Sequence, residues 1–319
     1  MAIYTGSNKH LGGTDKTTNK NQFYYGLVQK KVLVTGGTGQ LGSELKEFTT
    51  QNESMFQYYF TGSADLDITQ LDAVRSFVKQ HSIEYIVNCA AYTMVDLCET
   101  NVEMCNAVNH LGAENLAKVA VEFNCKLIHI STDYVYDGAA SKPYQEDAPL
   151  NPLSVYGKAK LKAEEAVISI APNSIIIRVA WLYSSYKTNF VKTMLRLMSE
   201  CDTLTIVNDQ HGTPTYAGDV AEAITIVLED AEGGEWRTGV YHFSNLGETT
   251  WYGFAEKIKE FSKIESCQLK PIETKDYPTA AVRPLYTVLD KTKIQDAFHF
   301  TIPHWEESLK KFLDKLNKN

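Results

Sequence analysis

Tyr156 and Lys160 are the two residues whose types and spacing point most directly to chemistry. They lie four apart in NPLSVYGKAKLKAEEAV (residues 151–167), which predicts the start of a helix with Ser154 as its N-cap. Residues at this spacing project from one helix face. A lysine cation beside a tyrosine favours the phenolate and lowers the phenol pKa from its ordinary value of about 10. Such a tyrosine could give a proton to a carbonyl oxygen as hydride reaches the carbon.

The same spacing occurs a second time, at Tyr183 and Lys187. That pair falls in a predicted loop, without a helix and without a hydroxyl on an upstream strand. Tyr156 instead follows Thr132, which stands at the carboxyl end of the strand-like run KLIHIST. Thr132 could donate a second hydrogen bond to the same carbonyl oxygen. The surroundings therefore favour Tyr156, with Lys160 beside it.

A glycine loop, TGGTGQLG (residues 35–42), follows the first strand-like run and opens a helical one. Gly37, Gly39 and Gly42 make GxGxxG, and Gly36 with the last two makes GxxGxxG. These glycines permit a tight turn, approach of a pyrophosphate, and close packing of helix on strand. The helix N-terminus offers free N–H groups to the phosphates. We therefore expect a dinucleotide here rather than a plain turn.

The end of the second predicted strand bears on the choice of dinucleotide. An acid that binds the ribose is expected about 20 residues after the glycines. Thr61, Gly62 and Ser63 occupy that place, so neither an acid nor an arginine stands there. We expect NADPH to be preferred, with NADH possible; Asp65 is the acid that would reverse this preference.

The stretch DLDIT (residues 65–69) has two interpretations. Asp67 and Ile68 could flank the adenine, or Thr69 could cap the helix that follows. The residue types allow both.

Short apolar runs alternate with helical patterns from residue 31 onward: KVLVT, MFQYYFTG, IEYIVNCAA, KLIHIST and SIIIRVAWLY read as strands. This alternation predicts an α/β fold of the Rossmann type, with a doubly wound parallel sheet. We expect a dinucleotide-binding domain over residues 31–180. Residues 181–319 would form mainly a smaller α/β substrate lobe, interleaved with that domain, and residues 1–30 a leader outside the main fold.

The composition excludes several classes of protein. A formal net charge of -8 over 319 residues disfavours a nucleic-acid partner. The six cysteines form no CxxC and the histidines no HExxH, so we expect free thiols and no metal site, with no support for Mg²⁺. No run reaches the length of about 18 apolar residues that a membrane helix needs, and the first 30 residues lack a signal-peptide core. We expect a cytoplasmic protein without a membrane partner.

Several segments resemble, in order and spacing, the extended short-chain dehydrogenase/reductases, and within them the dTDP-4-dehydrorhamnose reductase family: VLVTGGTGQLG, IVNCAAYTMVD, ISTDYVYDG, NPLSVYGKAKLKAEE, RVAWLY, NFVKTML, VNDQHGTPT and TTWYGFAEKI. The similarity runs from about residue 31 to the last helix. It implies NADPH-dependent reduction of the C4 ketone of dTDP-4-dehydro-L-rhamnose to dTDP-L-rhamnose, a nucleotide sugar for cell-surface polysaccharide.

The resemblance also implies roles for residues. Thr132, Tyr156 and Lys160 would be catalytic, and Thr132, Asp133 and Trp181 would contact the substrate. The alternative for Trp181 is a core aromatic after a strand. The residues implied at the cofactor are Gly36, Thr38, Gly39, Gln40, Leu41, Gly42, Asp67, Ile68, Ala91, Tyr92, Thr93, Tyr156 and Lys160.

Some features depart from relatives or leave alternatives open. Leu285 and Tyr286 follow an Arg-Pro pair where the family tends to show a small polar residue. Related dehydratases carry a glutamate at the position of Tyr134, so elimination is not expected. Another nucleotide-sugar 4-reductase, a 4-epimerase and a non-catalytic NADP-binding regulatory subunit stay open as alternatives. A monomer and a homodimer both fit.

Overall fold

The computed structural model describes residues 29–317, so most of the expected leader lies outside the described residues. Six parallel strands form one sheet in the order β2-β1-β3-β4-β5-β10. Their bounds are β1 Lys30–Thr35, β2 Phe56–Thr61, β3 Tyr85–Asn88, β4 Lys126–Thr132, β5 Ile175–Val179 and β10 Gly239–Phe243.

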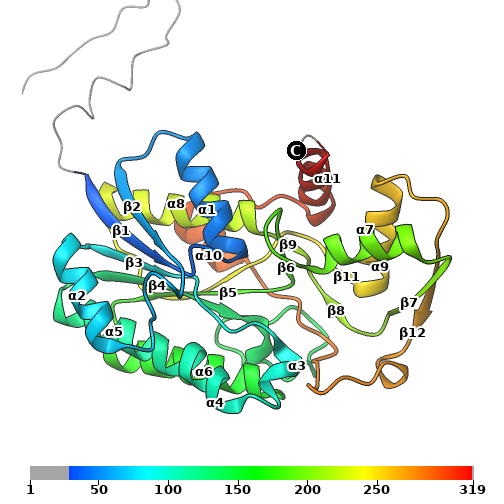
Figure 1. Cartoon of the computed structure of the whole chain (residues 1–319), viewed down its shortest axis with the longest axis horizontal. Coiled ribbons are helices and arrows are strands. Elements are labelled where there is room, and N and C mark those ends of the chain that lie inside the picture. The colour runs from blue at the N-terminus through cyan, green and yellow to red at the C-terminus, as the bar shows by residue number, and fades with distance from the viewer. Residues whose placement is uncertain (1–28, 318–319) are drawn as a thin grey trace, which may run out of the picture.

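Helices cover both faces of the sheet (Figure 1), because successive strand residues point to opposite sides. In β1, Val32 and Val34 pack in one core cluster and Leu33 in the other. The first face carries α1 (Gln40–Gln51), α8 (Ala217–Gly233) and α10 (Thr292–Phe298); the second carries α2 (Leu71–His81), α5 (Gly112–Glu122) and α6 (Val155–Ile170). The predicted doubly wound α/β fold is confirmed.

The strand order reverses between β1 and β3. Doubly wound sheets bind ligands at such a point, beyond the carboxyl ends of the strands. The glycine loop leaves β1 at this edge, and the ends of β3, β4 and β5 lie beside it.

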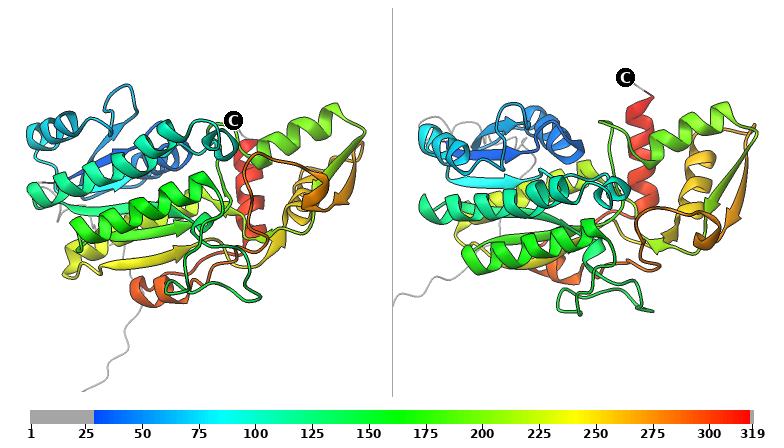
Figure 2. Two further views of the ribbon diagram at one scale, coloured as in Figure 1. Left: turned by 90° about the horizontal axis from the view of Figure 1, so that it is seen from below. Right: turned by 60° about the horizontal axis from the view of Figure 1, so that its bottom comes forward.

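A second lobe lies beyond the carboxyl ends of the strands (Figure 2). Its core gathers side chains of three helices, α7 (Phe190–Glu200), α9 (Trp251–Phe261) and α11 (Trp305–Leu316). Short strand pairs complete it: β7 (Thr203–Val207) with β12 (Gln268–Ile272), β6 (Leu182–Tyr183) with β9 (Thr215–Tyr216), and β8 (His211–Gly212) with β11 (Thr249–Thr250). The sheet domain in turn takes β10, α8 and α10 from beyond residue 181.

Residues 101–124, whose sequence is typical of one long helix, do not form one regular α-helix. They contain α4 (Val102–Asn106), a π-helical turn η2 (Ala107–Leu111) and α5. The wider turn contains Asn109, whose side chain bonds to the backbone of Tyr92. Short elements elsewhere are α3 (Val95–Cys98), η3 (Asp133–Val135) and η4 (Thr274–Asp276).

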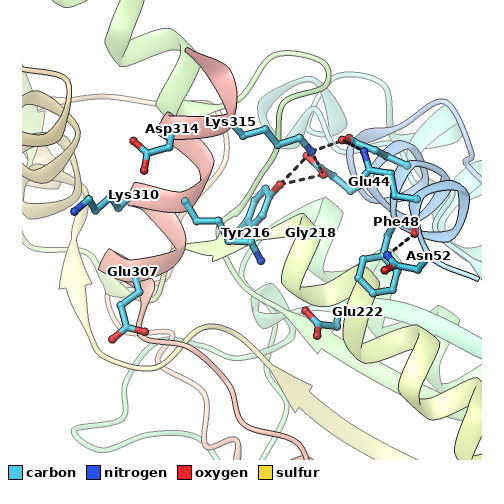
Figure 3. A pocket seen from close by; sticks show the side chains of 13 residues that line it. Glu44, Phe48, Asn52, Tyr216, Gly218, Glu222, Glu307, Lys310, Asp314 and Lys315 are labelled. Carbon is cyan, nitrogen blue, oxygen red and sulfur yellow. Dashed lines mark hydrogen bonds and ion pairs between the residues drawn. The ribbon is translucent and has the colours of Figure 1, made fainter. Parts of the chain in front are cut away.

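The helix α11 is tied to α1, the helix that follows the glycine loop (Figure 3). Lys315 Nζ lies 3.0 Å from Glu44 Oε2 and 2.7 Å from Glu47 Oε2, and the Tyr216 hydroxyl donates to Glu44 Oε2 at 3.2 Å. A cavity of about 1030 Å³ lies beside this cluster. Its lining contains none of the residues predicted for the site, so the tie is structural.

Within residues 29–317, none of the helices is long and apolar enough to cross a membrane. All six cysteines fall in this range and are free thiols. Within the same range, no three His, Cys, Asp or Glu side chains are grouped as a metal site requires.

Candidate active site

A cavity of about 390 Å³ lies at the carboxyl ends of the strands, between the glycine loop and α6. Ten of the predicted residues line it: Gly39, Gln40, Leu41, Ala91, Thr93, Thr132, Asp133, Tyr156, Lys160 and Trp181. Six others do not: Gly36, Thr38, Gly42, Asp67, Ile68 and Tyr92. The fold therefore brings the three residues predicted to be catalytic to one cavity that also borders the glycine loop.

The glycine loop has the shape that a pyrophosphate needs. Gly36 has φ of 67°, and a Cβ there would lie 2.6 Å from Ala90 N. A Cβ at Gly42 would lie 2.3 Å from Gly36 O, so α1 can approach the loop only without a side chain at this position. Gly39 is the N-cap of α1, which has no side-chain cap, and its Cβ would meet only Gly36 O at 3.1 Å. The helix N-terminus is thus open to a phosphate.

Asp67 and Ile68 are engaged elsewhere. Ile68 is buried and packs on Gly112. A Cβ added to Gly112 would lie only 2.5 Å from Ile68 Cδ1. Asp67 Oδ1 accepts from both the backbone N and the hydroxyl of Thr69, at 2.9 and 2.8 Å. The suggestion that Thr69 caps α2 is wrong, since the N-cap is Gln70 and makes no side-chain cap bond. The Thr69 hydroxyl instead donates to Asp67 and accepts from the Gln70 side-chain amide.

Thr132 and Asp133 form a buried pair at the end of β4. The Thr132 hydroxyl donates to Asp133 Oδ1 at 3.0 Å and accepts from Tyr134 N at 3.2 Å. Asp133 Oδ2 is buried and has no hydrogen-bond partner among residues 29–317. Burial raises the pKa of Asp133 to about 6, and interactions with the Thr287 and Thr132 hydroxyls oppose this rise. The pair thus offers a substrate a free carboxylate oxygen beside a hydroxyl.

Tyr156 is a buried side chain on α6. Ser154 caps this helix as predicted, accepting from Gly157 N at 3.1 Å. Burial raises the pKa of Tyr156 well above the ordinary value for a phenol, although a hydrogen bond with Thr132 opposes the rise. The expectation that Lys160 lowers this pKa is therefore wrong. The reason is burial of the phenol, which disfavours the charged phenolate.

Lys160 is also buried, on the same helix. Its Nζ donates to Ile130 O at 2.7 Å and lies 3.2 Å from His129 Nε2. Burial lowers the pKa of Lys160 to about 8. The lysine can therefore gain or lose a proton close to neutral pH.

Asn109 is a residue of the site that the sequence patterns did not single out. From the π-helical turn η2, its Oδ1 accepts from Tyr92 N at 2.8 Å and its Nδ2 donates to Tyr92 O at 3.0 Å. These two bonds fix the backbone between Ala91 and Thr93, both of which line the cavity. No signal in the sequence could have found it, because Asn109 is one of several asparagines in the helical stretch of residues 101–124.

Trp181 both lines the cavity and packs against other residues. Its backbone has φ of 43°, which side-chain-bearing residues rarely adopt. Its ring stacks on Trp251, with centroids 3.6 Å apart and planes 8° apart, and a Cβ on Gly212 would lie 2.5 Å from the indole. Trp251 also lines a second cavity, of about 370 Å³, together with Arg283. The two cavities therefore share Trp251.

Comparison with known proteins identifies the family. A family model described as "RmlD substrate binding domain" matches residues 30–318. The dTDP-4-dehydrorhamnose reductase of Aggregatibacter actinomycetemcomitans is 40% identical over 286 residues, 88% of this chain and 97% of that protein. This chain belongs to the dTDP-4-dehydrorhamnose reductase family. The resemblance seen in the sequence motifs is thereby confirmed.

Two other members extend the comparison. The crystal structure of dTDP-4-dehydrorhamnose reductase from Bacillus anthracis in complex with NADP has a TM-score of 0.84 and 33% identity, covering 90% of this chain and 100% of that one. The dTDP-4-keto-6-deoxy-D-glucose reductase of Streptomyces niveus is 34% identical over 287 residues, 89% of this chain and 97% of that protein. Relatives at similar identity thus carry the names of two different 4-keto sugar reductases.

Proposed function

We propose that this protein is an NAD(P)-dependent oxidoreductase that reduces the C4 ketone of dTDP-4-dehydro-L-rhamnose to dTDP-L-rhamnose. The observation that carries the proposal is the common cavity of Thr132, Tyr156 and Lys160, next to an open helix N-terminus built by glycines. Membership of the dTDP-4-dehydrorhamnose reductase family gives the substrate. The product is an activated sugar for cell-surface polysaccharide.

The cavity supplies the proton side of the reduction. A nicotinamide held by the glycine loop would supply hydride to the ketone carbon. Tyr156, whose raised pKa keeps it protonated, donates its proton to the ketone oxygen. Thr132 donates a second hydrogen bond to that oxygen once its hydroxyl turns away from Asp133. The Lys160 ammonium offsets the phenolate charge left on Tyr156.

The two cavities suggest how a sugar nucleotide is placed. We propose that the keto sugar lies in the cavity of Tyr156, where the unpartnered Asp133 Oδ2 accepts from a sugar hydroxyl. The nucleotide then lies in the adjoining cavity with Arg283, beyond the tryptophan pair. Arg283 is held in place by Asp96, 2.6 Å away on α3. A guanidinium there suits an anionic diphosphate.

For the cofactor, we propose NADPH as the preferred donor, with NADH also used. Thr61, Gly62 and Ser63 present no acid at the end of β2, and the Asp65 carboxylate is engaged by Gly62 N at 2.9 Å. The relative from Bacillus anthracis was crystallised with NADP. The glycine loop, Ala91 and Thr93 would contact the dinucleotide. Asp67 is exposed and uses only Oδ1 for Thr69, whereas Ile68, whose side chain is buried, could reach the adenine only through its backbone.

We further propose that the sheet domain, residues 31–180 with β10, α8 and α10 added, holds the dinucleotide and that the remaining lobe holds the sugar nucleotide. The six free thiols favour a reducing compartment, so we assign the enzyme to the cytoplasm. The net charge of -8 argues against a nucleic-acid partner.

The test is oxidation of NADPH by the purified protein, followed by absorbance, with the sugar product identified by mass spectrometry and NMR. We expect stoichiometric oxidation with dTDP-4-dehydro-L-rhamnose and configuration of L-rhamnose in the product. A faster reaction with dTDP-4-keto-6-deoxy-D-glucose would favour the second candidate, which the Streptomyces niveus relative supports.

Two other outcomes would contradict the proposal. Interconversion of C4 epimers without net oxidation of NADPH would identify a 4-epimerase. Binding of NADPH without turnover of either ketone would identify a regulatory subunit. Elimination is disfavoured because Tyr134 stands where dehydratases carry a glutamate.

A further inference from the structure

His129 is a buried titratable residue that the proposed reaction does not use. It lies on β4 and is 1% exposed, as are its two neighbours Asn88 and Lys160. One ring nitrogen, Nδ1, is 3.0 Å from Asn88 Nδ2, and the other, Nε2, is 3.2 Å from Lys160 Nζ. The imidazole therefore bridges β3 and the lysine of the site.

The amide of Asn88 has only one orientation that satisfies its neighbours. Its Oδ1 accepts from the Thr35 hydroxyl at 2.8 Å and from Ala90 N at 3.1 Å. A backbone N–H can only donate, so the group facing it must be the amide oxygen. The amide NH₂ then faces His129 Nδ1 and must donate to it. Nδ1 consequently carries no proton.

A neutral imidazole has one N–H, which must then be on Nε2. Burial and the charge of Lys160 hold the pKa of His129 well below its ordinary value, so the ring is neutral. Its Nε2–H points at Lys160 Nζ. An amine can accept this hydrogen bond, but an ammonium has no lone pair and cannot.

We propose that His129 is a positioning residue for Lys160: its Nε2–H, fixed by Asn88, can donate to the lysine only when the lysine is a neutral amine, and so favours release of the lysine's proton. Protonation of Lys160 requires either two donors to face each other or the Asn88 amide to rotate. Rotation breaks the bond to Ala90 N, next to Ala91 at the cavity. The effect of His129 on catalysis rests on the proposed function, whereas the tautomer of His129 does not.

Other charged or titratable groups face Lys160 and act in the opposite direction. Glu164 on α6, Cys89 after β3 and Cys105 on α4 each raise its pKa. Glu164 is paired with Arg178 at 2.6 Å, which offsets its charge, and burial raises the pKa of Cys89 to about 12, so that thiol is neutral. His129 is the group in direct contact with Nζ that opposes the ammonium.

The first experiment needs no substrate. In protein labelled with ¹⁵N-histidine, we expect His129 to show an unprotonated Nδ1 and a protonated Nε2 between about pH 6 and 9. The resonance is assigned by its loss in His129→Gln. A protonated Nδ1 in the wild type would overturn the proposal without the need for any variant to fold.

The second experiment titrates Lys160 by NMR of labelled lysine, assigned through Lys160→Met. His129→Gln replaces the fixed donor with an amide that can turn its oxygen to the ammonium, so the midpoint should rise by about one pH unit. An unchanged or lower midpoint overturns the proposal. His242→Gln is the matched control, because His242 is a buried histidine on β10 that contacts Tyr136 and Asp290 O. An equal shift in this control would also overturn it.

Asn88→Asp is the second variant, for use if His129→Gln does not fold. A carboxylate can only accept, so His129 should change to the Nδ1–H tautomer and turn the lone pair of Nε2 to Lys160. Retention of the Nε2–H tautomer would contradict the mechanism. In the reductase assay, activity should decline at high pH as Lys160 loses its proton, and His129→Gln should move this decline to higher pH by the same amount. If no reductase activity exists, the proposed function fails and the tautomer result still stands.

Discussion

The indole of Trp181 stacks on that of Trp251, with ring centroids 3.6 Å apart and planes 8° apart. Trp251 is anchored by its Nε1–H, which donates to Gln210 Oε1 at 3.1 Å. The second tryptophan therefore holds the first, although 70 residues separate them. The stacking covers one face of the Trp181 ring, so under the proposed function a sugar can contact only the other face.

Trp251→Ala should raise KM for the sugar nucleotide by about 3- to 10-fold, because Trp181 loses its stacking partner. The dissociation constant of NADPH should change little, since Trp251 begins α9 of the second lobe rather than an element of the sheet domain. Trp181→Ala should act in the same direction. The control is Trp236→Ala, a tryptophan that bonds to Asn173 O and lines neither cavity. Weakened NADPH binding with an unchanged KM for sugar would show that the pair belongs to the cofactor side.

Tyr156→Phe should lower kcat by about 10²- to 10⁴-fold and leave NADPH binding intact, because only the proton donor is lost. Tyr183→Phe is a matched control from the second Tyr-x-x-x-Lys in the chain. Tyr183 is buried on β6 and its hydroxyl has no partner among residues 29–317, so its removal should leave kcat near the wild-type value. Equal losses in the two variants would mean that Tyr156 is a packing residue only.

The pH profile of reduction should have two limbs. Activity should decline above about pH 8, where Lys160 loses its proton, while Tyr156 with its raised pKa stays protonated. Activity should also decline below about pH 6, where the Asp133 carboxylate gains a proton and no longer accepts a hydrogen bond from the substrate as a charged group. Asp133→Asn should remove the acid limb. A decline confined to pH values above 10 would assign the alkaline limb to Tyr156 instead.

Lys160→Met should increase stability while it lowers activity. The folded-state pKa of about 8 lies below the ordinary value of 10.5, so between these values the unfolded chain binds more protons and stability rises with pH. Below pH 8 the cost of the buried ammonium is fully present. At pH 7 the variant should gain about 1–3 kcal/mol in the free energy of unfolding, measured with urea. Lys158→Met, at an exposed position of the same helix, should be neutral. Loss of stability in Lys160→Met would show that its bond to Ile130 O outweighs the charge.

Asp65→Asn should shift cofactor preference further toward NADPH. The amide oxygen can keep the bond to Gly62 N, but the negative charge near the end of β2 disappears. The ratio of kcat/KM for NADPH over NADH should rise by about 2- to 5-fold. Asp296→Asn, on α10, should leave the ratio unchanged. A constant ratio in Asp65→Asn would place this carboxylate away from the ribose.

Five of the six strands of the sheet could be predicted from sequence because they appear as short, mainly apolar runs between helical patterns, whereas β10 was not predicted. KVLVT, for example, became β1 with one residue added at its start. The π-helical turn could not be predicted, since it depends on a bond between Asn109 and a loop that is distant in sequence. The two-residue strands of the second lobe, such as β6 and β9, are too short to show a period.

The parts of the site that depend on short segments of sequence could be predicted. The spacing of Tyr156 and Lys160 on one helix and the glycine turn are properties of short segments, and both reach the cavity. The direction of the lysine side chain is not local, because it follows from Ile130 and His129 on another element. The expected effect of Lys160 on the Tyr156 pKa was wrong because burial of the phenol, another property of the folded chain, raises that pKa. Ile68 is likewise buried by its contact with Gly112.

The tie between Lys315 and Glu44 has a consequence for biosynthesis. The two side chains lie 271 positions apart, and Glu44 is buried on the helix that starts at the glycine loop. A nascent chain can form β1 to β5 early, but this carboxylate stays without its cation until residue 315 has been translated. An unpaired buried charge destabilises its surroundings by several kcal/mol, on the order of 3–5. Ribosomal products that stop short of α11 should therefore expose α1 to proteases, and the dinucleotide site matures only after nearly all of the chain has been made.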